Sequence, residues 1–311
     1  MHIPDNYLSP STCAAFGVVM LPIWRRASLK VKNEITRQKM PLLGVAAAFS
    51  FLIMMFNIPL PGGTTAHAIG GALVAILLGR YSAVLAVTIA LVIQALFFGD
   101  GGILALAVNC FNMAFIMPFT SFYLFEITKK IFKNRKGEYI GAFLGGYISV
   151  NAAALFAAVE LGVQPLLFKD FSGLPLYSPY GLAVSIPAML IPHLLVIGIL
   201  EGIITVGAYS YIKKASPDVI YKGKASKINL LYTIIGFVPK GMEQGFKFNS
   251  PIPDYSFGFL SSYFGYILSA LAGVIIILII FKVLEKINLK RNIKGDIYYL
   301  ILVNGVKLAS H

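Results

Sequence analysis

Residues 103–128, ILALAVNCFNMAFIMPFTSFYLFEIT, contain a single charged side chain, that of Glu126. An α-helix needs roughly 20 mostly apolar residues to cross the hydrocarbon core of a bilayer, so this stretch is long enough to span one. The basic sequence KKIFKNRK follows at residues 129–136, as is typical of a loop on the cytoplasmic side of a membrane. The stretch therefore indicates a transmembrane helix that ends at the cytoplasm.

The chain as a whole has the composition of a membrane protein. Of its 311 residues, 58% are hydrophobic and 13% are charged, and the mean hydropathy is +0.79. Soluble domains carry about 25% charged residues, so half that charge points to lipid as the surrounding solvent. We expect an all-α fold, a polytopic integral membrane helical bundle, because helices satisfy their own backbone hydrogen bonds inside a lipid bilayer.

Nine apolar runs are candidates for the membrane crossings. They cover residues 10–24, 40–60, 66–79, 82–98, 103–128, 139–161, 181–212, 228–239 and 258–281. The third and the eighth are short, so we expect them to be tilted, broken or completed by re-entrant backbone. Seven crossings would form one core, and two further transmembrane helices would follow it.

Lysine and arginine are divided unequally between alternate loops. With the amino terminus outside, the predicted cytoplasmic loops hold 23 of the 26 basic residues, and only Lys169, Lys240 and Lys247 lie outside. Basic loops are retained on the cytoplasmic side during insertion. We therefore predict a multi-pass protein of the cell (plasma or inner) membrane, with an extracellular amino terminus and a cytoplasmic carboxyl terminus. No basic residue precedes the first apolar run, so we expect it to be retained rather than cleaved as a signal peptide.

The net charge of +13 does not by itself indicate nucleic acid. The basic residues lie between long apolar runs, as juxtamembrane charges do, and we expect no nucleic-acid partner. A basic linker at residues 216–227 divides the chain into a membrane core at 1–215 and a two-helix module with a cytoplasmic tail at 228–311. The loop GMEQGFKFNSPIPDYSFGF, residues 241–259, lies between the last two predicted helices.

His2 follows Met1 directly and creates a chelating group at the amino terminus. The Met1 amine, the His2 amide and the His2 imidazole together close a five-membered and a six-membered ring on one ion. An amide nitrogen binds only after it loses its proton, which favours ions with a planar preference such as Ni(II) or Cu(II). A free Met1 amine is required, so acylation would abolish this binding. On the dipeptide alone, a solvent-exposed terminal histidine is the simpler explanation.

A second imidazole is expected at the same membrane face. In NIPLPGGTTAHAIGG, residues 57–71, prolines and glycines break a helix, and Thr64 and Thr65 have hydroxyls that can cap a new one. His67 would then lie in its first turn. A packed histidine at a helix mouth is the plain alternative, but together with His2 this position predicts a shared metal site formed by Met1, His2 and His67.

Other polar residues are weaker candidates for the surroundings of that site. Asp100 lies in the outer loop GDGG, and Asn109 and Asn112 lie in the following span. Either a turn or an interhelical hydrogen bond explains these residues as well. Ionisable side chains inside a span are functional candidates, but His193 and Glu201 are eight residues apart and fit either a structural pair or partners on other helices. The sequence has no phosphate-binding GxxxxGK[ST] motif, so any ATPase must be another chain.

The motifs MHIPDNYLSP, PGGTTAHAIGG and FFGDGGILALAVNCFNMA resemble the CbiM/NikM family, the substrate-binding components of energy-coupling factor transporters for cobalt and nickel. The resemblance covers roughly residues 1–215 and implies that Met1, His2 and His67 hold the ion in a near-planar nitrogen cage. Residues 225–290 resemble more weakly a fused N component, which leans toward nickel. The resemblance to the CbiM/NikM family also implies a CbiQ/NikQ-like coupling subunit in the membrane and a pair of cytoplasmic CbiO/NikO-like ATPases.

The predicted function is therefore uptake of Ni2+ as the substrate-specific, non-enzymatic component of an ATP-driven importer, with no cofactor. Uptake of Co2+ for cobalamin biosynthesis is the alternative. The Irving–Williams order gives nickel the higher affinity at such a site, but the availability of each metal in the cell can override affinity. Two other classes are an intramembrane metalloenzyme, in which His193 and Glu201 would join a site with an open coordination position, and a structural membrane anchor. Metal binding by the isolated chain separates the classes.

Overall fold

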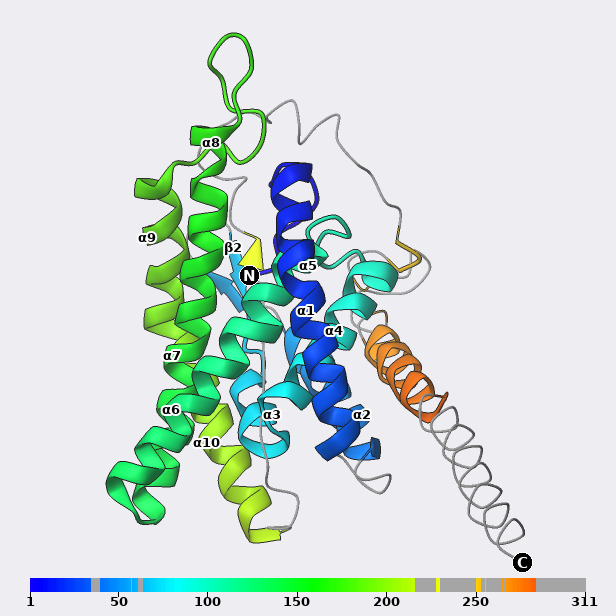
Figure 1. The fold of residues 1–311 in the computed structure, drawn as a ribbon, viewed down its shortest axis with the longest axis vertical. Helices are drawn as coiled ribbons and strands as arrows, with labels where there is room; N and C mark the ends of the chain where they lie inside the picture. The colour runs from blue at the N-terminus through cyan, green and yellow to red at the C-terminus, as the bar shows by residue number, and fades with distance from the viewer. Residues whose placement is uncertain are drawn as a thin grey trace, which may run out of the picture.

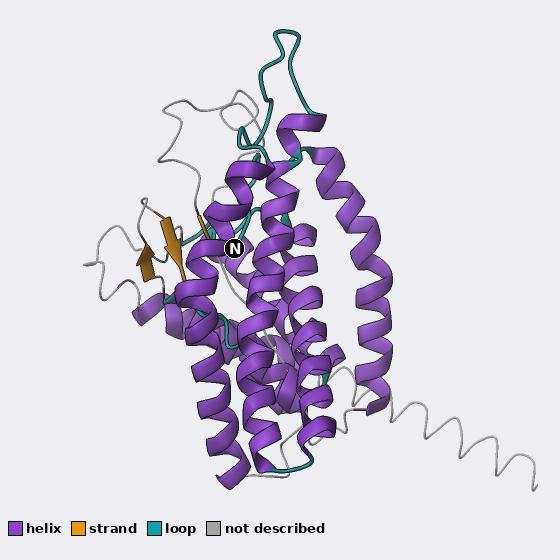
Figure 2. Ribbon diagram, turned by 90° about the vertical axis from the view of Figure 1, so that its left-hand side faces the viewer, coloured by secondary structure: helices purple, strands orange, loops and turns teal. Residues whose placement is uncertain are grey.

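The structure is a computed structural model that describes residues 1–34, 40–56, 58–60, 64–215, 228–229, 250–252, 255, 265 and 267–283. Most of these residues are helical, and the helices pack side by side into an elongated bundle (Figures 1 and 2). The α-helices are α1 (Pro10–Glu34), α2 (Met40–Met55), α3 (Gly71–Leu78), α4 (Arg80–Ile93), α5 (Leu106–Cys110), α6 (Met117–Phe132), α7 (Arg135–Gly162), α8 (Gln164–Leu167), α9 (Leu182–Pro192) and α10 (Gly198–Ala215).

Four helical stretches are long and apolar enough to cross a membrane, namely Arg80–Phe98, Leu106–Phe132, Arg135–Leu167 and Leu182–Ala215. Each corresponds to an apolar run that the sequence predicts to be a crossing. Two shorter apolar helices, Pro41–Met55 and Ile267–Val283, match the second and ninth runs. The prediction of a helical membrane protein is therefore confirmed, whereas its number of crossings stays a prediction.

The third apolar run, residues 66–79, is not one helix. It begins in strand β2 (Thr64–Ala66), continues as irregular chain and ends as α3. Helix α3 has eight residues and so spans only about 12 Å. Strand β2 pairs antiparallel with β1 (Ile58–Leu60) and with β3 (Ile228–Asn229), and this small sheet lies against the bundle (Figure 2). The eighth predicted run thus begins in a strand beside β2, and its residues 230–239 lie outside the described part.

Three of the long helical stretches contain a π-helical turn. These turns are η2 (Gln94–Phe98), η3 (Phe111–Ile116) and η4 (His193–Ile197). Each carries a fully buried polar side chain, from Gln94, Asn112 and His193 respectively. Single π-helical turns of this kind occur frequently at functional sites, so their coincidence with buried polar groups draws attention to the interior of the bundle.

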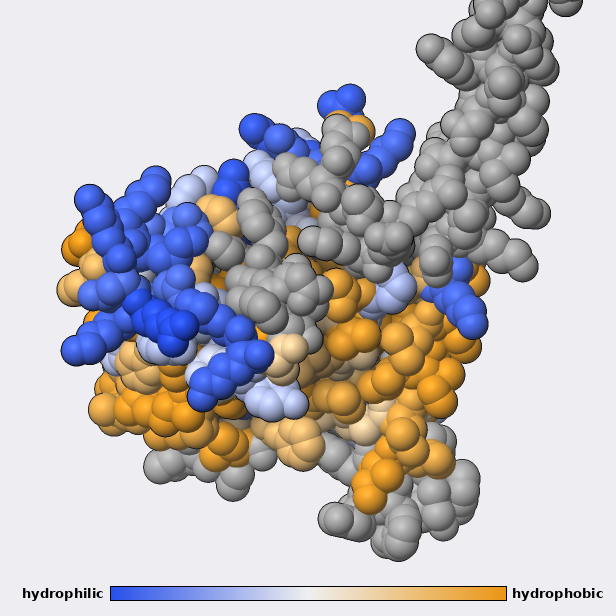
Figure 3. Space-filling view, turned by 90° about the horizontal axis from the view of Figure 1, so that it is seen from below, coloured by the Kyte–Doolittle hydropathy of each residue, from blue (hydrophilic) through white to orange (hydrophobic). Residues whose placement is uncertain are grey.

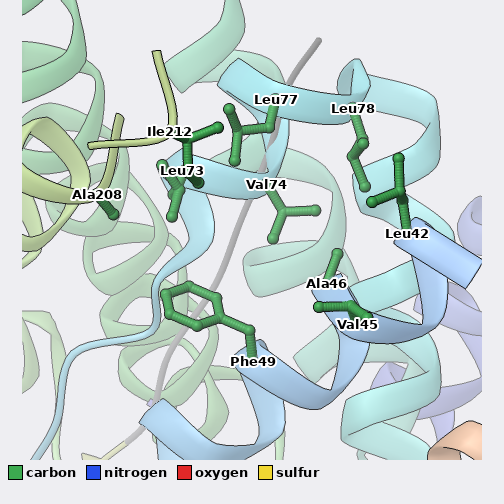
Figure 4. Close-up of a pocket in the computed structure, with 10 residues that line it drawn as sticks. All are labelled: Leu42, Val45, Ala46, Phe49, Leu73, Val74, Leu77, Leu78, Ala208 and Ile212. Carbon is green, nitrogen blue, oxygen red and sulfur yellow. The ribbon is translucent and has the colours of Figure 1, made fainter. Parts of the chain in front are cut away.

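One end of the bundle is basic. Helix α6 carries Lys129 and Lys130 in its last turn and α10 carries Lys213 and Lys214 in its last turn, and α7 begins at Arg135. Figure 3, seen from below, shows hydrophilic side chains gathered on this face and apolar side chains around it. An apolar hollow lies between α2, α3 and α10 and is lined by Leu, Val, Ala, Ile and Phe side chains (Figure 4). All ten described residues that line it are apolar, so none of their side chains could hold an ion.

Candidate metal centre

The first three residues are buried inside the bundle. Met1 is fully buried, and His2 and Ile3 are 4% and 1% exposed. Figure 1 shows the amino terminus among the helices rather than at either end of the molecule. A solvent-exposed terminal histidine, the simplest alternative for His2, is therefore wrong.

Asn109 of α5 holds this segment at Ile3. Its Oδ1 accepts a hydrogen bond from the Ile3 N–H at 2.7 Å, and its Nδ2 donates to the Ile3 carbonyl at 3.0 Å. The N–H of Gly102 donates to the same carbonyl at 3.0 Å. Both backbone polar groups of Ile3 are thus satisfied in a buried place, where an unpaired group would cost stability.

Further contacts continue along the segment toward α1. The carboxylate of Asp5 accepts hydrogen bonds from the N–H groups of Ile103 and Leu104, at 2.9 and 2.8 Å, where the chain turns into α5. The N–H of Ser9 donates to Gln164 Oε1 at 3.0 Å. The amino-terminal segment is therefore tied to two distant parts of the chain, which limits the positions that Met1 and His2 can adopt.

The loop of residues 99–102 packs directly on His2. Gly101 has a φ of +96°, and a Cβ built on it would lie 3.3 Å from two carbons of the His2 ring. Only glycine adopts this backbone conformation without strain. In the same loop, Oδ1 of the Asp100 carboxylate lies 3.8 Å from His2 Nδ1. Neither imidazole nitrogen of His2 has a hydrogen-bond partner among the described residues.

His67 is fully buried in the irregular stretch between β2 and α3. Its Nδ1 lies 3.0 Å from the Ala68 carbonyl oxygen. Because a carbonyl only accepts, Nδ1 carries the proton and Nε2 keeps its lone pair. Histidines that ligate metals commonly donate their other nitrogen in this way. Sequence reasoning placed His67 in the first turn of a helix capped by Thr64 or Thr65, which is wrong, because both threonines belong to β2 and the helix begins at Gly71.

Glu201 of α10 caps that helix instead. Its carboxylate accepts hydrogen bonds from the N–H groups of Ile69, Gly70 and Gly71 at 2.7, 3.0 and 2.7 Å. These are the N–H groups at the start of α3, where a helix has no internal acceptors and where negative charge is favourable. The buried carboxylate therefore fixes the chain immediately after His67. Of the two alternatives that the sequence left open for Glu201, these hydrogen bonds show partners on another helix.

The structure brings His2, His67 and the Met1 amine together. The two imidazole rings have centroids 6.3 Å apart and planes inclined by 39°. Burial lowers the pKa of His2 well below the usual value, and the nearby positive Met1 amine lowers it further. This shift favours the neutral imidazole, which is the form that ligates metals.

His193 is fully buried at the start of η4. Its own Nδ1 is 2.7 Å from the Met189 carbonyl, and its Nε2 has no hydrogen-bond partner among the described residues. The Nδ2 of Asn112 donates to Glu160 at 2.5 Å. Asp100 and Asn109 contact the amino-terminal segment, whereas for Thr64 and Thr65 the structure gives only their place in β2.

Side chains alone do not supply a complete set of ligands. Within the described part of the chain, no three His, Cys, Asp or Glu side chains converge as a metal-binding group. An ion between His2 and His67 would therefore need backbone nitrogens as well, and the Met1 amine and His2 amide are the nearest ones along the chain. The sequence did not reveal the roles of Glu201 and Asn109, because both act across long sequence separations.

Comparisons with known proteins place the chain among metal transport proteins. The family model CbiM, described as a cobalt uptake substrate-specific transmembrane region, matches residues 2–219. The "probable fused nickel transport protein LarMN" of Lactiplantibacillus plantarum is 43% identical over an alignment of 324 positions, which covers 92% of this chain and 98% of that protein. The fused nickel transport protein NikMN of Rhodobacter capsulatus is 38% identical, over 89% and 95% of the two chains.

A crystal structure of a truncated transition metal transporter shares the fold. It is 50% identical to this chain, covers 69% of it and 99% of the solved chain, and superimposes with a TM-score of 0.66.

Proposed function

The chain belongs to the CbiM family of cobalt uptake substrate-specific transmembrane regions, and we propose that it captures Ni2+ at the extracellular face of the cell membrane for ATP-driven uptake. The observation that carries the proposal is the burial of Met1 and His2 beside His67. A terminus exposes its amine to solvent unless something requires it inside. Here the amine, two neutral imidazoles and one backbone amide can surround a single ion.

The proposed site is a planar set of four nitrogens. The Met1 amine, the His2 amide and His2 Nδ1 occupy three corners, and His67 Nε2 occupies the fourth. Square-planar nitrogen coordination suits Ni(II) or Cu(II) better than Zn(II), which favours a tetrahedron. The ion is cargo, so the site has to release it as well as bind it, and no chemical step follows binding.

The likeness to fused nickel transport proteins over nearly the full chain supports nickel over cobalt. It also supports our division of the chain into a substrate-binding core at 1–215, a linker at 216–227 and an N-component-like module at 228–311. In the proposed assembly, a coupling subunit in the membrane and two cytoplasmic ATPases supply the energy, and the amino terminus faces outward. Cobalt is the competing cargo, because the family model is described by cobalt uptake.

The test is metal affinity of the purified full chain with its native amino terminus. Calorimetry compares three versions: native, extended by one residue before Met1, and His67→Ala. We expect extension to abolish nickel binding although every side chain survives, because it converts the amine to an amide and moves the chelate. His67→Ala should weaken binding strongly, and a carboxyl-terminal tag serves as the matched control with no effect.

Two results would contradict the proposal. If the extended chain binds nickel as tightly as the native one, the amine and amide are not ligands. If the native chain binds Co2+ tightly and Ni2+ only weakly in the same titration, cobalt is the cargo. His193→Ala is expected to change the nickel affinity only a few fold, because its imidazole lies outside the four-nitrogen set.

A further inference from the structure

A side chain from the carboxyl-terminal module reaches the surroundings of the candidate site. Tyr255 belongs to the sequence PIPDYSFGF between the last two predicted helices, yet it is only 3% exposed and joins the main core of the bundle. Its neighbours in sequence touch the same region, since the N–H of Ile252 donates to the Phe97 carbonyl at 2.8 Å. The module therefore contacts the end of η2.

Several contacts hold the Tyr255 ring in one orientation. The ring stacks on Phe98 with centroids 4.8 Å apart and planes inclined by 24°, and its edge meets Phe51 at 6.3 Å. The hydroxyl of Ser269 donates to the Tyr255 carbonyl at 3.0 Å. The residue has a φ of +57°, a conformation that is strained for an aromatic residue and clusters at functional positions. Such a side chain is fixed by its surroundings rather than loosely packed.

The Tyr255 hydroxyl lies in a directed chain of hydrogen bonds. Gln94 Nε2 donates to this hydroxyl at 2.9 Å. The hydroxyl in turn donates its single proton to Oδ2 of Asp100. The other carboxylate oxygen, Oδ1, lies 3.8 Å from His2 Nδ1. The hydrogen bonds therefore run from Gln94 to Tyr255 to Asp100 and orient the carboxylate, and His2 lies beyond it at 3.8 Å without a hydrogen bond.

The row of hydrogen bonds has an electrostatic consequence for a bound ion. A divalent ion bound by one deprotonated amide and three neutral nitrogens keeps one net positive charge. That charge would be buried, since His2 is 4% exposed and His67 is fully buried, and an uncompensated buried charge is unfavourable. Asp100 is the carboxylate beside the proposed ligand atom His2 Nδ1, and it can neutralise the bound ion without ligating it. A carboxylate in this role must be held in place, as groups behind metal ligands commonly are.

We propose that Tyr255 is a positioning residue for metal capture: its hydroxyl fixes the Asp100 carboxylate, which compensates the charge of the divalent ion held at Met1, His2 and His67. The inference rests on the proposed function and deepens it. It makes the carboxyl-terminal module part of the binding site through one hydroxyl group. A module that served only to recruit partner subunits would not need this contact.

The test is a double-mutant cycle on the full chain with its native amino terminus, with Ni2+ affinity measured by calorimetry. The variants are Tyr255→Phe, Asp100→Asn and the two combined. Tyr209→Phe is the matched control, because the Tyr209 hydroxyl also donates to a carboxylate, that of Glu138 at 3.1 Å, at the basic end of the bundle. Melting temperatures of the metal-free proteins and visible spectra of the nickel-saturated proteins are recorded in parallel.

We expect Tyr255→Phe to weaken nickel binding about tenfold and Asp100→Asn at least as much. The combined variant should bind no more weakly than Asp100→Asn alone, because the tyrosine acts through that carboxylate. Tyr209→Phe should leave affinity unchanged. The visible spectrum at saturation should stay that of planar nickel in all variants, since no nitrogen ligand is removed.

Additive losses in the combined variant would overturn the inference, because Tyr255 would then act by another route. Unchanged affinity in Asp100→Asn would overturn it independently of Tyr255→Phe. Nickel binding by the unsubstituted chain tests the proposed function separately: if that chain binds no nickel, the proposed function itself is wrong. If that chain binds nickel and Tyr255→Phe binds it equally well, only the present inference fails.

Discussion

The side-chain amide of Asn109 pairs with the backbone of Ile3 at both of its polar groups, through bonds of 2.7 and 3.0 Å. The two residues are 106 positions apart in sequence. The pairing resembles a rung of a β-ladder in which a side chain replaces one strand. It holds the chain one residue after His2, so it sets how far the amino terminus enters the bundle.

Asn109→Ala should therefore weaken both stability and nickel binding. Loss of two hydrogen bonds leaves buried groups of Ile3 unpaired or underpaired, which costs about 1–3 kcal/mol. Nickel affinity should fall by about tenfold or more, because the terminal chelate is no longer held in place. Calorimetry and denaturant titration measure the two effects. Asn151→Ala is the control: its Nδ2 donates to the Tyr147 carbonyl at 2.7 Å, so it should affect stability alone. Equal affinity in the two variants would contradict the positioning role of Asn109.

Glu201→Gln should disturb the segment that carries His67. A glutamine has one acceptor oxygen where the carboxylate serves the N–H groups of Ile69, Gly70 and Gly71, and its NH2 group would face donors. The expected loss of stability is about 3 kcal/mol, accompanied by weaker nickel binding. Thermal melting of the metal-free protein and calorimetry give the two values. If Glu201→Gln keeps both the melting temperature and the nickel affinity of the unsubstituted chain, other contacts hold the start of α3.

Gly101→Ala tests the close approach of the 99–102 loop to His2. The substitution introduces backbone strain at a φ of +96° and a methyl group 3.3 Å from the imidazole ring. Gly173→Ala is the matched control, because it has a φ of +79° and nothing within 4 Å of the new carbon. Both should cost about 1–3 kcal/mol of strain, but only Gly101→Ala should weaken nickel binding. Parallel loss of affinity in both variants would remove the argument for contact at His2.

The predicted orientation is testable by labelling in intact cells. A cysteine at Phe171, a fully exposed position in the loop after α8, should react with a membrane-impermeant maleimide. A cysteine at Lys133, between α6 and α7, should react only after the membrane is permeabilised. The natural Cys13 and Cys110 are buried free thiols, so the unsubstituted chain should give little background. The reverse pattern would invert the topology.

The purified chain should hydrolyse no ATP above background, because its sequence lacks a GxxxxGK[ST] phosphate-binding loop. A phosphate-release assay with and without Ni2+ measures this. Addition of the coupling subunit and ATPases should restore hydrolysis. Turnover by the chain alone would show that it has an energy source of its own.

The sequence by itself determined that this is a helical membrane protein and to which family it belongs. Hydropathy reports the solvent around a segment, and in lipid only a helix or a closed barrel satisfies the backbone. The chelating potential of Met1 and His2 is also readable from sequence, because its three nitrogens are consecutive along the chain. These properties are local, so no knowledge of distant partners is needed to infer them.

Tertiary structure alone decided which distant groups support the site. Glu201 caps a helix 130 residues away in sequence, whereas cap signals in sequence are searched among neighbouring residues. The same carboxylate accepts from the N–H groups at the point where the run at 66–79 becomes helical. Tyr255 reaches Asp100 across 155 positions. Hydrogen bonds of this kind depend on how helices pack, and hydropathy contains no record of which buried polar group meets which.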